Sequence, residues 1–454
     1  MSKHLRVAIF GAGPAGIYAG NILSRQYPDV SIDLFDLLPA PYGLIRYGVA
    51  PDHPRIKGIV NSLHEMLDDG AIRFFGNVEF GKDLTLEQVR EHYHAVIFAT
   101  GAIKDAALNI PGVDLEGSFG AADFVSWYDG HPDFPRTWPL TAKQVAVLGN
   151  GNVALDVARM LAKGADDLLS TDIPENVYQG LKASPVTDVH VFGRRGPAQI
   201  KFTPIELREL GEVKDVDIVV YEEDFPEGWF NENAEGVTNQ HRVMARVINE
   251  WRTRELTGAS RRLHLHFFSS PQEILGDESG KVQGIRFERT QLNADGVSVS
   301  GTGKTVEFPV QAVYRAIGYF GSQLPQIPFD EKHGVIANQG GRVIDESGSP
   351  ITGLFATGWI KRGPVGLIGH TKSDAMETID NLVADADKFA DPVKPESDSI
   401  LETLRAAGVR YTTWAGWLKL NQHELGLGAA DSSPVERERV KVVDREEQIR
   451  LAGA

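Results

Sequence analysis

Cysteine is absent from the 454 residues of this chain. Its absence excludes disulfides, thiolate metal sites, cysteine-ligated iron–sulfur clusters and a redox-active dithiol within the chain. Long apolar runs are also missing, because none approaches the ~18 residues of a membrane span. Positive charge is scarce: 46 Lys and Arg face 62 Asp and Glu, giving a net charge of −16. This balance argues against nucleic acid and anionic membranes as partners.

The remaining composition, 42% hydrophobic and 24% charged, is that of a globular protein. The length suffices for two or three domains. The opening MSKHLRVAIFGAG runs from apolar residues into a glycine turn without a small-residue cleavage site. We interpret it as a first strand and not as a signal peptide, and we expect a monomeric, cytoplasmic protein.

The first candidate nucleotide site is GAGPAG, which follows an apolar strand predicted over 5–10 and precedes a predicted helix. In such a turn Gly11 closes the bend, Gly13 lets the backbone approach a pyrophosphate, and Gly16 lets the helix pack on the strand. The helix N-terminus offers free N–H groups to the phosphates. A second strand ends at Asp36, 20 residues after Gly16, where an acid would bind ribose hydroxyls. An unphosphorylated adenosine ribose, as in FAD or NAD, suits this site.

A second candidate site lies in VLGNGNVALDVARM, where Gly149, Gly151 and Ala154 fit G-x-G-x-x-A between a strand and a helix. The next predicted strand ends in Arg194 and Arg195, where an NAD site would have an acid. Guanidinium groups suit a 2′-phosphate, although a solvated surface pair is the alternative. The two turns therefore predict different ligands, FAD at the first and NADP at the second.

Late apolar strands over 308–321 and 353–363 again run into glycine, and the late ATG-W segment echoes the early ATG at 99–101. We therefore predict an α/β fold with two Rossmann-like dinucleotide-binding domains, the NADP domain inserted into the FAD domain. The predicted boundaries are 1–104 for the first FAD-domain segment, 105–325 for the NADP domain, and 326–454 for the second FAD-domain segment and a C-terminal extension. A chain that binds a flavin and a nicotinamide brings a hydride donor to an acceptor. Without cysteine, the electrons must leave for an acceptor outside the chain.

Two further segments are punctuated by glycine and proline: GLIRYGVAPDHPRIK, which contains His53, and GWIKRGPVGLIGHTKSDA, which contains Trp359. Taken alone, His53 is best interpreted as a structural, hydrogen-bonded histidine, and Trp359 as a residue packed in the core. Together with GAGPAG, FFGNVEFG, YHAVIFATGA, LNIPGV, GNGNVALDVAR, VFGRRGP, FTPIELREL and AIGY, these segments make the chain resemble the adrenodoxin reductase family of ferredoxin–NADP reductases. The resemblance covers nearly the full length and is greatest to the bacterial, mycobacterial-type NADPH–ferredoxin reductases.

The resemblance implies the remaining site residues. FAD would contact Ala15, Asp36, Leu44, Phe80, Trp359, Gly366, Leu367 and Ile368, with Gly366 also near nicotinamide. NADP would be held by Asn150, Gly151, Asn152, Val153, Arg194, Arg195 and Glu206. His53 and Asp156 match a polar pair that the family places near the flavin, as candidate catalytic residues. An acid such as Asp156 in the first turn of a helix also has a plain dipole explanation. No metal site is predicted.

The chain departs from the family pattern at two places. These departures leave open how tightly it binds NADP and what charge it presents to its partner. Ala106, with Lys104 two residues earlier, stands where close relatives have an arginine. His370-Thr371-Lys372-Ser373 stands where relatives commonly have Thr-Asn-Lys-Lys.

The resemblance implies an NADPH–ferredoxin oxidoreductase. NADPH would give a hydride to the flavin, and single electrons would pass to an iron–sulfur ferredoxin that supplies enzymes such as cytochromes P450. An acidic ferredoxin would need a basic surface, and 241–262 is rich in arginine, with Arg242 and Arg246 on a predicted helix. An ordinary solvated helix face is the alternative. Two other functions stay open: a reductase of quinones or small acceptors, and a non-catalytic NADP-sensing flavoprotein.

Overall fold

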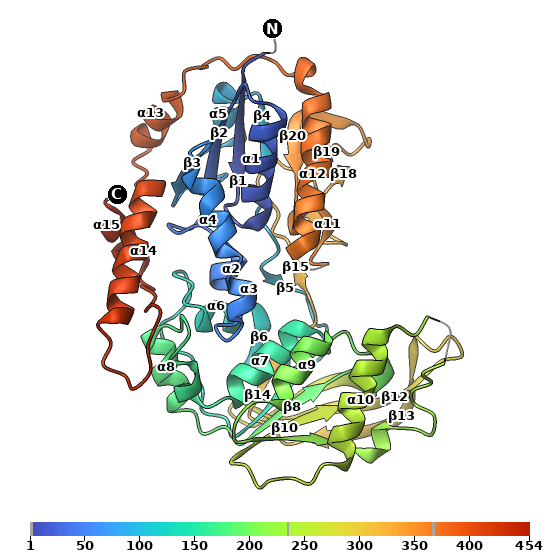
Figure 1. Cartoon of the computed structure of the whole chain (residues 1–454). Helices are drawn as coiled ribbons and strands as arrows, with labels where there is room; N and C mark the ends of the chain where they lie inside the picture. Colours follow the sequence, from blue (N-terminus) through green and yellow to red (C-terminus); the bar gives the residue numbers. More distant parts are fainter. Residues whose placement is uncertain (1–2, 234–235, 366–367) are drawn as a thin grey trace.

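The computed structural model describes residues 3–233, 236–365 and 368–454, with the side chain of Ile368 left out. Two lobes lie one above the other in Figure 1, the first built on a mixed sheet with a parallel centre and the second on a parallel sheet. The predicted α/β fold with two Rossmann-like units, one inserted into the other, is confirmed.

The first lobe is built on an eight-stranded sheet of order β18-β19-β20-β4-β1-β2-β3-β21. Its centre is parallel and comes from both ends of the chain, because β20 pairs with β4 in parallel. The echo between the two ATG segments is therefore a contact between neighbouring strands. The strands are β1 (Leu5–Phe10), β2 (Val30–Asp36), β3 (Ile72–Gly76), β4 (Ala95–Phe98), β18 (Asn338–Gln339), β19 (Arg342–Ile344), β20 (Pro350–Ala356) and β21 (Thr412–Thr413).

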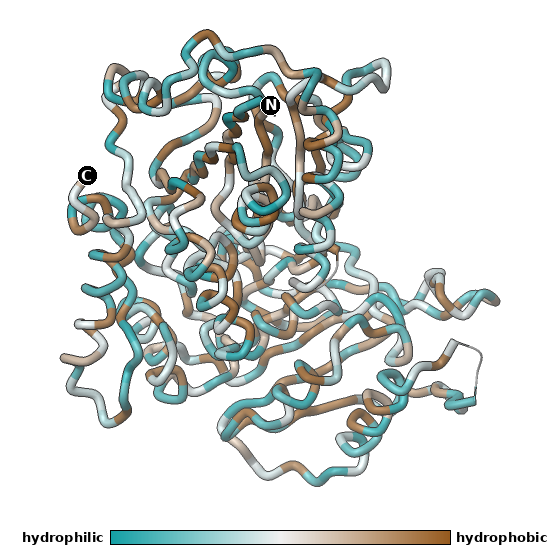
Figure 2. The backbone as a smooth tube through the Cα atoms, turned by 45° about the horizontal axis from the view of Figure 1, so that its top comes forward, coloured by the Kyte–Doolittle hydropathy of each residue, from teal (hydrophilic) through white to brown (hydrophobic). Residues whose placement is uncertain are grey.

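Helices and packed aromatic residues cover both faces of this sheet, so β1 is buried along its whole length. That burial explains why five of the six residues of LRVAIF are apolar instead of alternating with polar ones. The exception, Arg6, is buried with its guanidinium donating to the Glu396 and Ser397 carbonyls. The helices of this lobe are α1 (Pro14–Gln26), α2 (Leu44–Tyr47), α3 (Pro54–Lys57), α4 (Val60–Asp68), α5 (Leu86–His92), α11 (Trp359–Arg362), α12 (Ile368–Ala384) and α13 (Ser399–Ala406). Figure 2 shows the hydrophobic segments gathered inside the molecule.

The second lobe is built on a six-stranded sheet of order β6-β14-β7-β8-β10-β9. Its strands are β6 (Ser118–Gly120), β7 (Gln144–Leu148), β8 (Asp188–Phe192), β9 (Val216–Val220), β10 (Arg261–His266) and β14 (Ala312–Arg315). One apolar cluster packs this sheet against helices α6 (Ala121–Tyr128), α7 (Asn152–Ala162), α8 (Glu175–Lys182), α9 (Pro204–Gly211) and α10 (Asn239–Thr253). A second cluster joins it to an antiparallel sheet of β11 (Ser269–Gly276), β12 (Val282–Leu292) and β13 (Val299–Phe308).

The chain enters and leaves the second lobe through one short ribbon. Strands β5 (Lys104–Asp105) and β15 (Tyr319–Phe320) pair antiparallel between the lobes. A further short hairpin, β16 (Phe329–Asp330) with β17 (Val335–Ile336), follows as the chain returns to the first sheet.

The C-terminal segment runs down one side of both lobes, shown in red in Figure 1. It contains α14 (Trp414–Ala429) and α15 (Arg445–Ala452). Lys441, which is buried, pairs with Asp172 of the second lobe at 3.0 Å and donates to the Arg46 carbonyl of the first lobe at 2.8 Å. Arg437 donates to the Ile173 carbonyl of the second lobe at 2.9 Å. The segment therefore fastens the lobes together from outside.

Arg159 of α7 fastens the lobes together from inside. Its guanidinium is buried and donates two hydrogen bonds of 2.8 Å to the Asp52 carboxylate of the first lobe. Lys163, one turn later on α7, reaches the same carboxylate at 2.9 Å. Burial alone would raise the pKa of Asp52, but the hydrogen bonds and charge of Arg159 outweigh it and lower that pKa. Asp52 is therefore ionised at neutral pH.

Replacing Arg159 by Met should destabilise the protein by about 3–5 kcal/mol, because it leaves the buried Asp52 carboxylate without its bidentate partner. Denaturant unfolding of the purified protein measures this loss. Adding Asp52→Leu to the variant should recover most of it, since the unpaired buried charge is then gone.

Lys214→Met supplies the control, because Lys214 pairs with Asp167 through a side chain that is 82% exposed. This variant should unfold like the parent. An Arg159→Met protein as stable as the parent would show that the buried pair does not hold the lobes.

Candidate functional site

One cleft of about 2780 Å³ lies between the lobes. It exceeds the ~300–1,000 Å³ of an ordinary small-ligand pocket and leaves room for two large ligands. Its walls include the residues that end or follow strands β1, β2 and β4 of the first sheet and β7, β8 and β14 of the second. Ligands of open parallel sheets bind at these carboxyl ends. The two sheets therefore turn their binding edges toward the same space.

The first glycine turn joins β1 to α1 at one end of the cleft. A Cβ at Gly16 would collide with the Gly11 carbonyl, so the helix can pack this closely only with glycine there. At Gly13 a Cβ would meet nothing closer than 3.7 Å, so this part of the turn is open toward the cleft. Pro14 begins α1, and no side chain caps the helix N-terminus. The first-turn N–H groups are thus available to an anion.

Asp36 lies at the end of β2 and lines the cleft beside this turn. Its carboxylate accepts hydrogen bonds from the backbone N–H of Ala12 at 2.6 Å and of Leu38 at 2.8 Å. Burial raises the pKa of Asp36 to about 6, against the lowering effect of these two bonds. Each carboxylate oxygen has a second lone pair, so the group can also accept from ribose hydroxyls.

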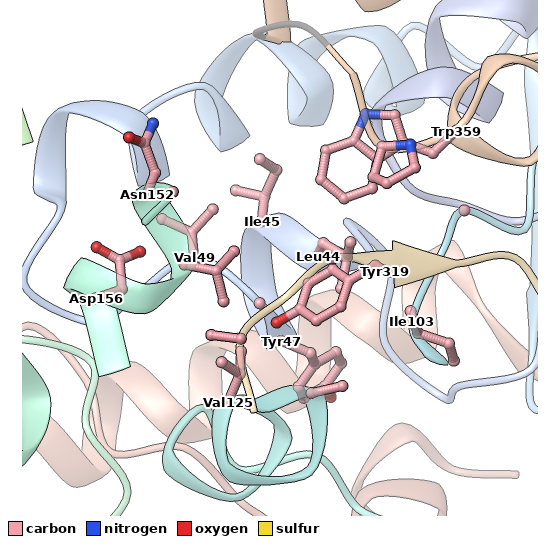
Figure 3. A pocket seen from close by; sticks show the side chains of 18 of the residues that line it. Leu44, Ile45, Tyr47, Val49, Ile103, Val125, Asn152, Asp156, Tyr319 and Trp359 are labelled. Carbon is pink, nitrogen blue, oxygen red and sulfur yellow. The ribbon is translucent and has the colours of Figure 1, made fainter. Parts of the chain in front are cut away.

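The other residues expected at FAD divide between the cleft wall and the core. Ala15, Leu44 and Trp359 line the cleft, and Figure 3 shows Leu44 and Trp359 there. Phe80 also reaches the wall, but its ring packs edge-on against Phe10 and Phe98 in the core, with centroids 4.9 and 5.0 Å away. Gly366 and Leu367 lie outside the described residues, and Ile368 is described only as the first residue of α12.

The second glycine turn joins β7 to α7 across the cleft. A Cβ at Gly149 would collide with the Ala316 carbonyl at the end of β14, whereas a Cβ at Gly151 would meet nothing within 4 Å. The N-terminus of α7 also lacks a side-chain cap. Of the residues expected at NADP, Asn150, Asn152, Val153 and Glu206 line the cleft with Gly151. This turn has the same open anion-binding geometry as the first.

Arg194 and Arg195 follow β8, the strand next to β7. Both line the cleft, and both also line a smaller pocket of about 330 Å³ shared with Ser270 and Thr290. Within the described part of the chain, neither guanidinium has a hydrogen-bond or ion-pair partner. Two unpaired cations are thus held side by side where the adenosine end of a dinucleotide would lie.

Glu206 faces the cleft from the first turn of α9, where Thr203 caps the helix. The Glu206 Oε2 atom is buried and has no hydrogen-bond partner among the described residues. Burial raises the pKa of Glu206. A buried acceptor without a donor is unfavourable, so it suits a hydroxyl brought by a ligand.

His53 and Asp156 meet between the two turns, His53 Nε2 lying 2.8 Å from Asp156 Oδ1. Glu209, which the sequence analysis did not single out, lies 3.2 Å from His53 Nδ1. Glu209 is three residues after Glu206 on α9, so both point into the cleft from one helix face. Burial acts to lower the pKa of His53, but the hydrogen bond and charge of Asp156 outweigh it and raise that pKa. The His53 ring therefore lies between the carboxylates of Asp156 and Glu209, with the Arg159 guanidinium also 2.8 Å from Nε2.

The expected basic segment 241–262 is divided by the structure. The helix α10 ends at Thr253, and Arg261 and Arg262 lie on β10, where they bond the Ala162 carbonyl and Asp188. Arg252 pairs with Glu222. Arg242 and Arg246 are exposed on α10, although Arg242 also donates to the Glu232 carbonyl. The exposed arginines of this segment without an ion-pair partner among the described residues are therefore Arg242 and Arg246 on α10 and Arg254 just after it. No helix within the described ranges is long and apolar enough to span a membrane.

Comparison with known proteins agrees with this geometry. The family described as pyridine nucleotide-disulphide oxidoreductase matches residues 5–189. NADPH-ferredoxin reductase FprA of Mycobacterium tuberculosis is 38% identical over 98% of both chains. Mitochondrial NADPH:adrenodoxin oxidoreductase of Bos taurus is 36% identical over 99% of this chain and 92% of its own.

Among solved structures, Mycobacterium tuberculosis FprA in complex with NADPH superposes with a TM-score of 0.91 and 38% identity, covering all of both chains. The matches run from end to end, through both glycine turns and the C-terminal segment. On this ground the chain belongs to the family of NADPH–ferredoxin and NADPH–adrenodoxin reductases.

Proposed function

We propose that this chain is an NADPH–ferredoxin oxidoreductase that carries electrons from NADPH, through bound FAD, to an iron–sulfur ferredoxin. One observation supports this most: two nucleotide turns open into one cleft, one followed by an acid and the other by an unpaired arginine pair. A chain without cysteine has no internal dithiol to reduce. Its electrons must therefore go to another molecule.

The residues of the first turn fit FAD, and those of the second fit NADP. Open backbone at Gly13 and uncapped N–H groups of α1 suit a pyrophosphate, and Asp36 suits an unphosphorylated ribose. At the second turn Gly151, Asn152 and Val153 lie at the α7 N-terminus, while Arg194 and Arg195 suit a 2′-phosphate. We accordingly assign residues 1–104 and 326–454 to FAD and residues 105–325 to NADP.

Bound FAD supplies an acceptor for a hydride that can give up its electrons singly, a chemistry that no side chain offers. The chain's own residues orient the two ligands and keep water out. Trp359 and Leu44 form an apolar wall at one end of the cleft. We assign His53 and Asp156, whose side chains lie 2.8 Å apart, as a polar pair that balances charge beside the flavin.

The docking surface for ferredoxin would be α10, with Arg242 and Arg246 exposed on a helix whose Val243 lines the cleft. A local basic surface on a chain of net charge −16 suits steering of an acidic partner. The protein would act as a cytoplasmic monomer.

The function is tested by NADPH-driven cytochrome c reduction with and without added ferredoxin, beside ferricyanide and quinone as direct acceptors. We expect cytochrome c reduction to depend on ferredoxin. Quinone turnover that matches the ferredoxin-dependent rate would favour the small-acceptor reductase. Flavin absorbance that NADPH never bleaches would favour the sensor.

Replacing Arg194 and Arg195 by Ala should lower the preference for NADPH over NADH by about 100-fold. Charge-assisted hydrogen bonds contribute roughly 1.5–3 kcal/mol each, reduced here by the solvent exposure of Arg194. Losing the arginine contacts to the 2′-phosphate should raise KM for NADPH. It should leave kcat nearly unchanged, because the 2′-phosphate is remote from the hydride that is transferred.

Steady-state kinetics with both nucleotides measure this preference. Arg254→Ala, a change at an exposed arginine outside the cleft lining, serves as the control and should alter neither constant. A double variant that still prefers NADPH to the parent's extent would remove the arginines from the site.

Replacing Arg242 and Arg246 by Glu should weaken ferredoxin-dependent cytochrome c reduction and flatten its dependence on salt, since steering needs unlike charge. The rate of ferricyanide reduction should change by less than about twofold, because a small acceptor reaches the flavin without needing a docking surface. Arg405→Glu on α13 is the matched charge reversal elsewhere on the surface. Equal loss in both assays would exclude α10 as the docking surface.

A further inference from the structure

Tyr319 lies where the nicotinamide end of NADP would run. In a sheet of this kind the dinucleotide crosses the ends of the strands at the glycine turn. Here β8, which carries the arginine pair, lies on one side of β7, and β14 lies on the other. The adenosine half belongs over β8, so the nicotinamide half belongs over β14. Ala316, just after β14, touches the turn at Gly149, and Tyr319 follows three residues later.

The Tyr319 hydroxyl is a buried polar group without a partner. Its oxygen is shielded from solvent and makes no hydrogen bond to any described residue. The side chain lines the cleft, and Figure 3 shows it among the pocket residues with Tyr47, Val125 and Asp156. Buried polar groups are nearly always hydrogen-bonded, so an orphan hydroxyl facing a ligand cleft points to a partner on the ligand.

The proton stays on this hydroxyl. Burial, together with the negative charges of Asp105 and Asp156, raises the pKa of Tyr319 above its ordinary value. Acidic neighbours would repel a phosphate or carboxylate brought close to the ring. The group can therefore offer a donor to a neutral acceptor such as an amide oxygen.

We propose that the Tyr319 hydroxyl binds the nicotinamide half of NADP(H) by donating a hydrogen bond to its carboxamide oxygen. The proposal rests on the assignment of NADP to the second glycine turn. It adds a contact at the reacting end of the nucleotide, on the other side of β7 from the arginine pair.

Tyr128 provides a matched comparison. Its hydroxyl is also buried without a partner among the described residues, and the residue is 0% exposed. It does not line the cleft. Removing that hydroxyl takes away a phenol oxygen that is likewise shielded and unpartnered among the described residues but lies outside the cleft lining.

The test is binding of NADP⁺ and of adenosine 2′,5′-bisphosphate, which lacks nicotinamide, to the purified flavoprotein by calorimetry. Tyr319→Phe should raise the Kd for NADP⁺ by about 2- to 12-fold, the range for one neutral hydrogen bond. Its Kd for the bisphosphate should not change. Its midpoint temperature without nucleotide should not fall, because the hydroxyl has no protein partner to lose. Tyr128→Phe should leave both Kd values unchanged.

The proposal is overturned if Tyr319→Phe binds NADP⁺ like the parent, if it loses both ligands equally, or if Tyr128→Phe gives the same loss. A shift of the flavin midpoint potential in nucleotide-free Tyr319→Phe would instead assign the hydroxyl to the flavin. Failure of the underlying site assignment is visible separately. In that case the Arg194 and Arg195 double variant would bind the bisphosphate as tightly as the parent.

Discussion

The buried guanidinium of Arg159 fixes how the two halves of the cleft face each other. It reaches Asp52 on the first lobe and Asp156 on its own helix, and His53 Nε2 lies 2.8 Å from the same nitrogen. A buried charge is tolerated only with its partners in place, so α7 cannot slide relative to the loop at 52–53 without losing them. Because α7 begins at the second glycine turn, the same contact sets the position of that turn relative to the first lobe. The spacing between two bound nucleotides thus depends on this ion-pair cluster together with the C-terminal segment that joins the lobes from outside.

Some arginines of this chain form hydrogen bonds and ion pairs within the fold, and others do not. Arg6, Arg46, Arg159 and Arg437 are buried and bonded to carboxylates or carbonyls. Arg194, Arg195 and Arg246 have no partner within the described residues and lie at the cleft or on α10. An acidic protein that leaves cations unpaired keeps them available for anions from outside. Arginines bonded within the fold are thus distinct from these three, which are left unpaired at the cleft and on α10.

Much of the fold could be predicted because its signals are local. The strand expected over 5–10 is β1, and β4 and β20, the strands that lead into the two ATG segments, are neighbours. The pairing of His53 with Asp156 came only from family resemblance, since no spacing predicts contact between residues 103 apart. Glu209 was missed although it lies one helical turn from Glu206. Tyr319 and Arg159 were missed because their importance arises from burial between lobes, which a sequence does not display.

The ribbon that joins the lobes gives the fold a modular character. Lys104 pairs with Phe320 and Asp105 with Tyr319, so the inserted lobe begins and ends on adjacent strands. A segment whose ends are neighbours can be exchanged as a cassette without stretching the host, as in tolerated domain insertions. Specificity for the pyridine nucleotide could therefore change by replacement of the inserted lobe. The first sheet, which takes strands from both the N-terminal and the C-terminal parts of the chain, would keep its flavin site.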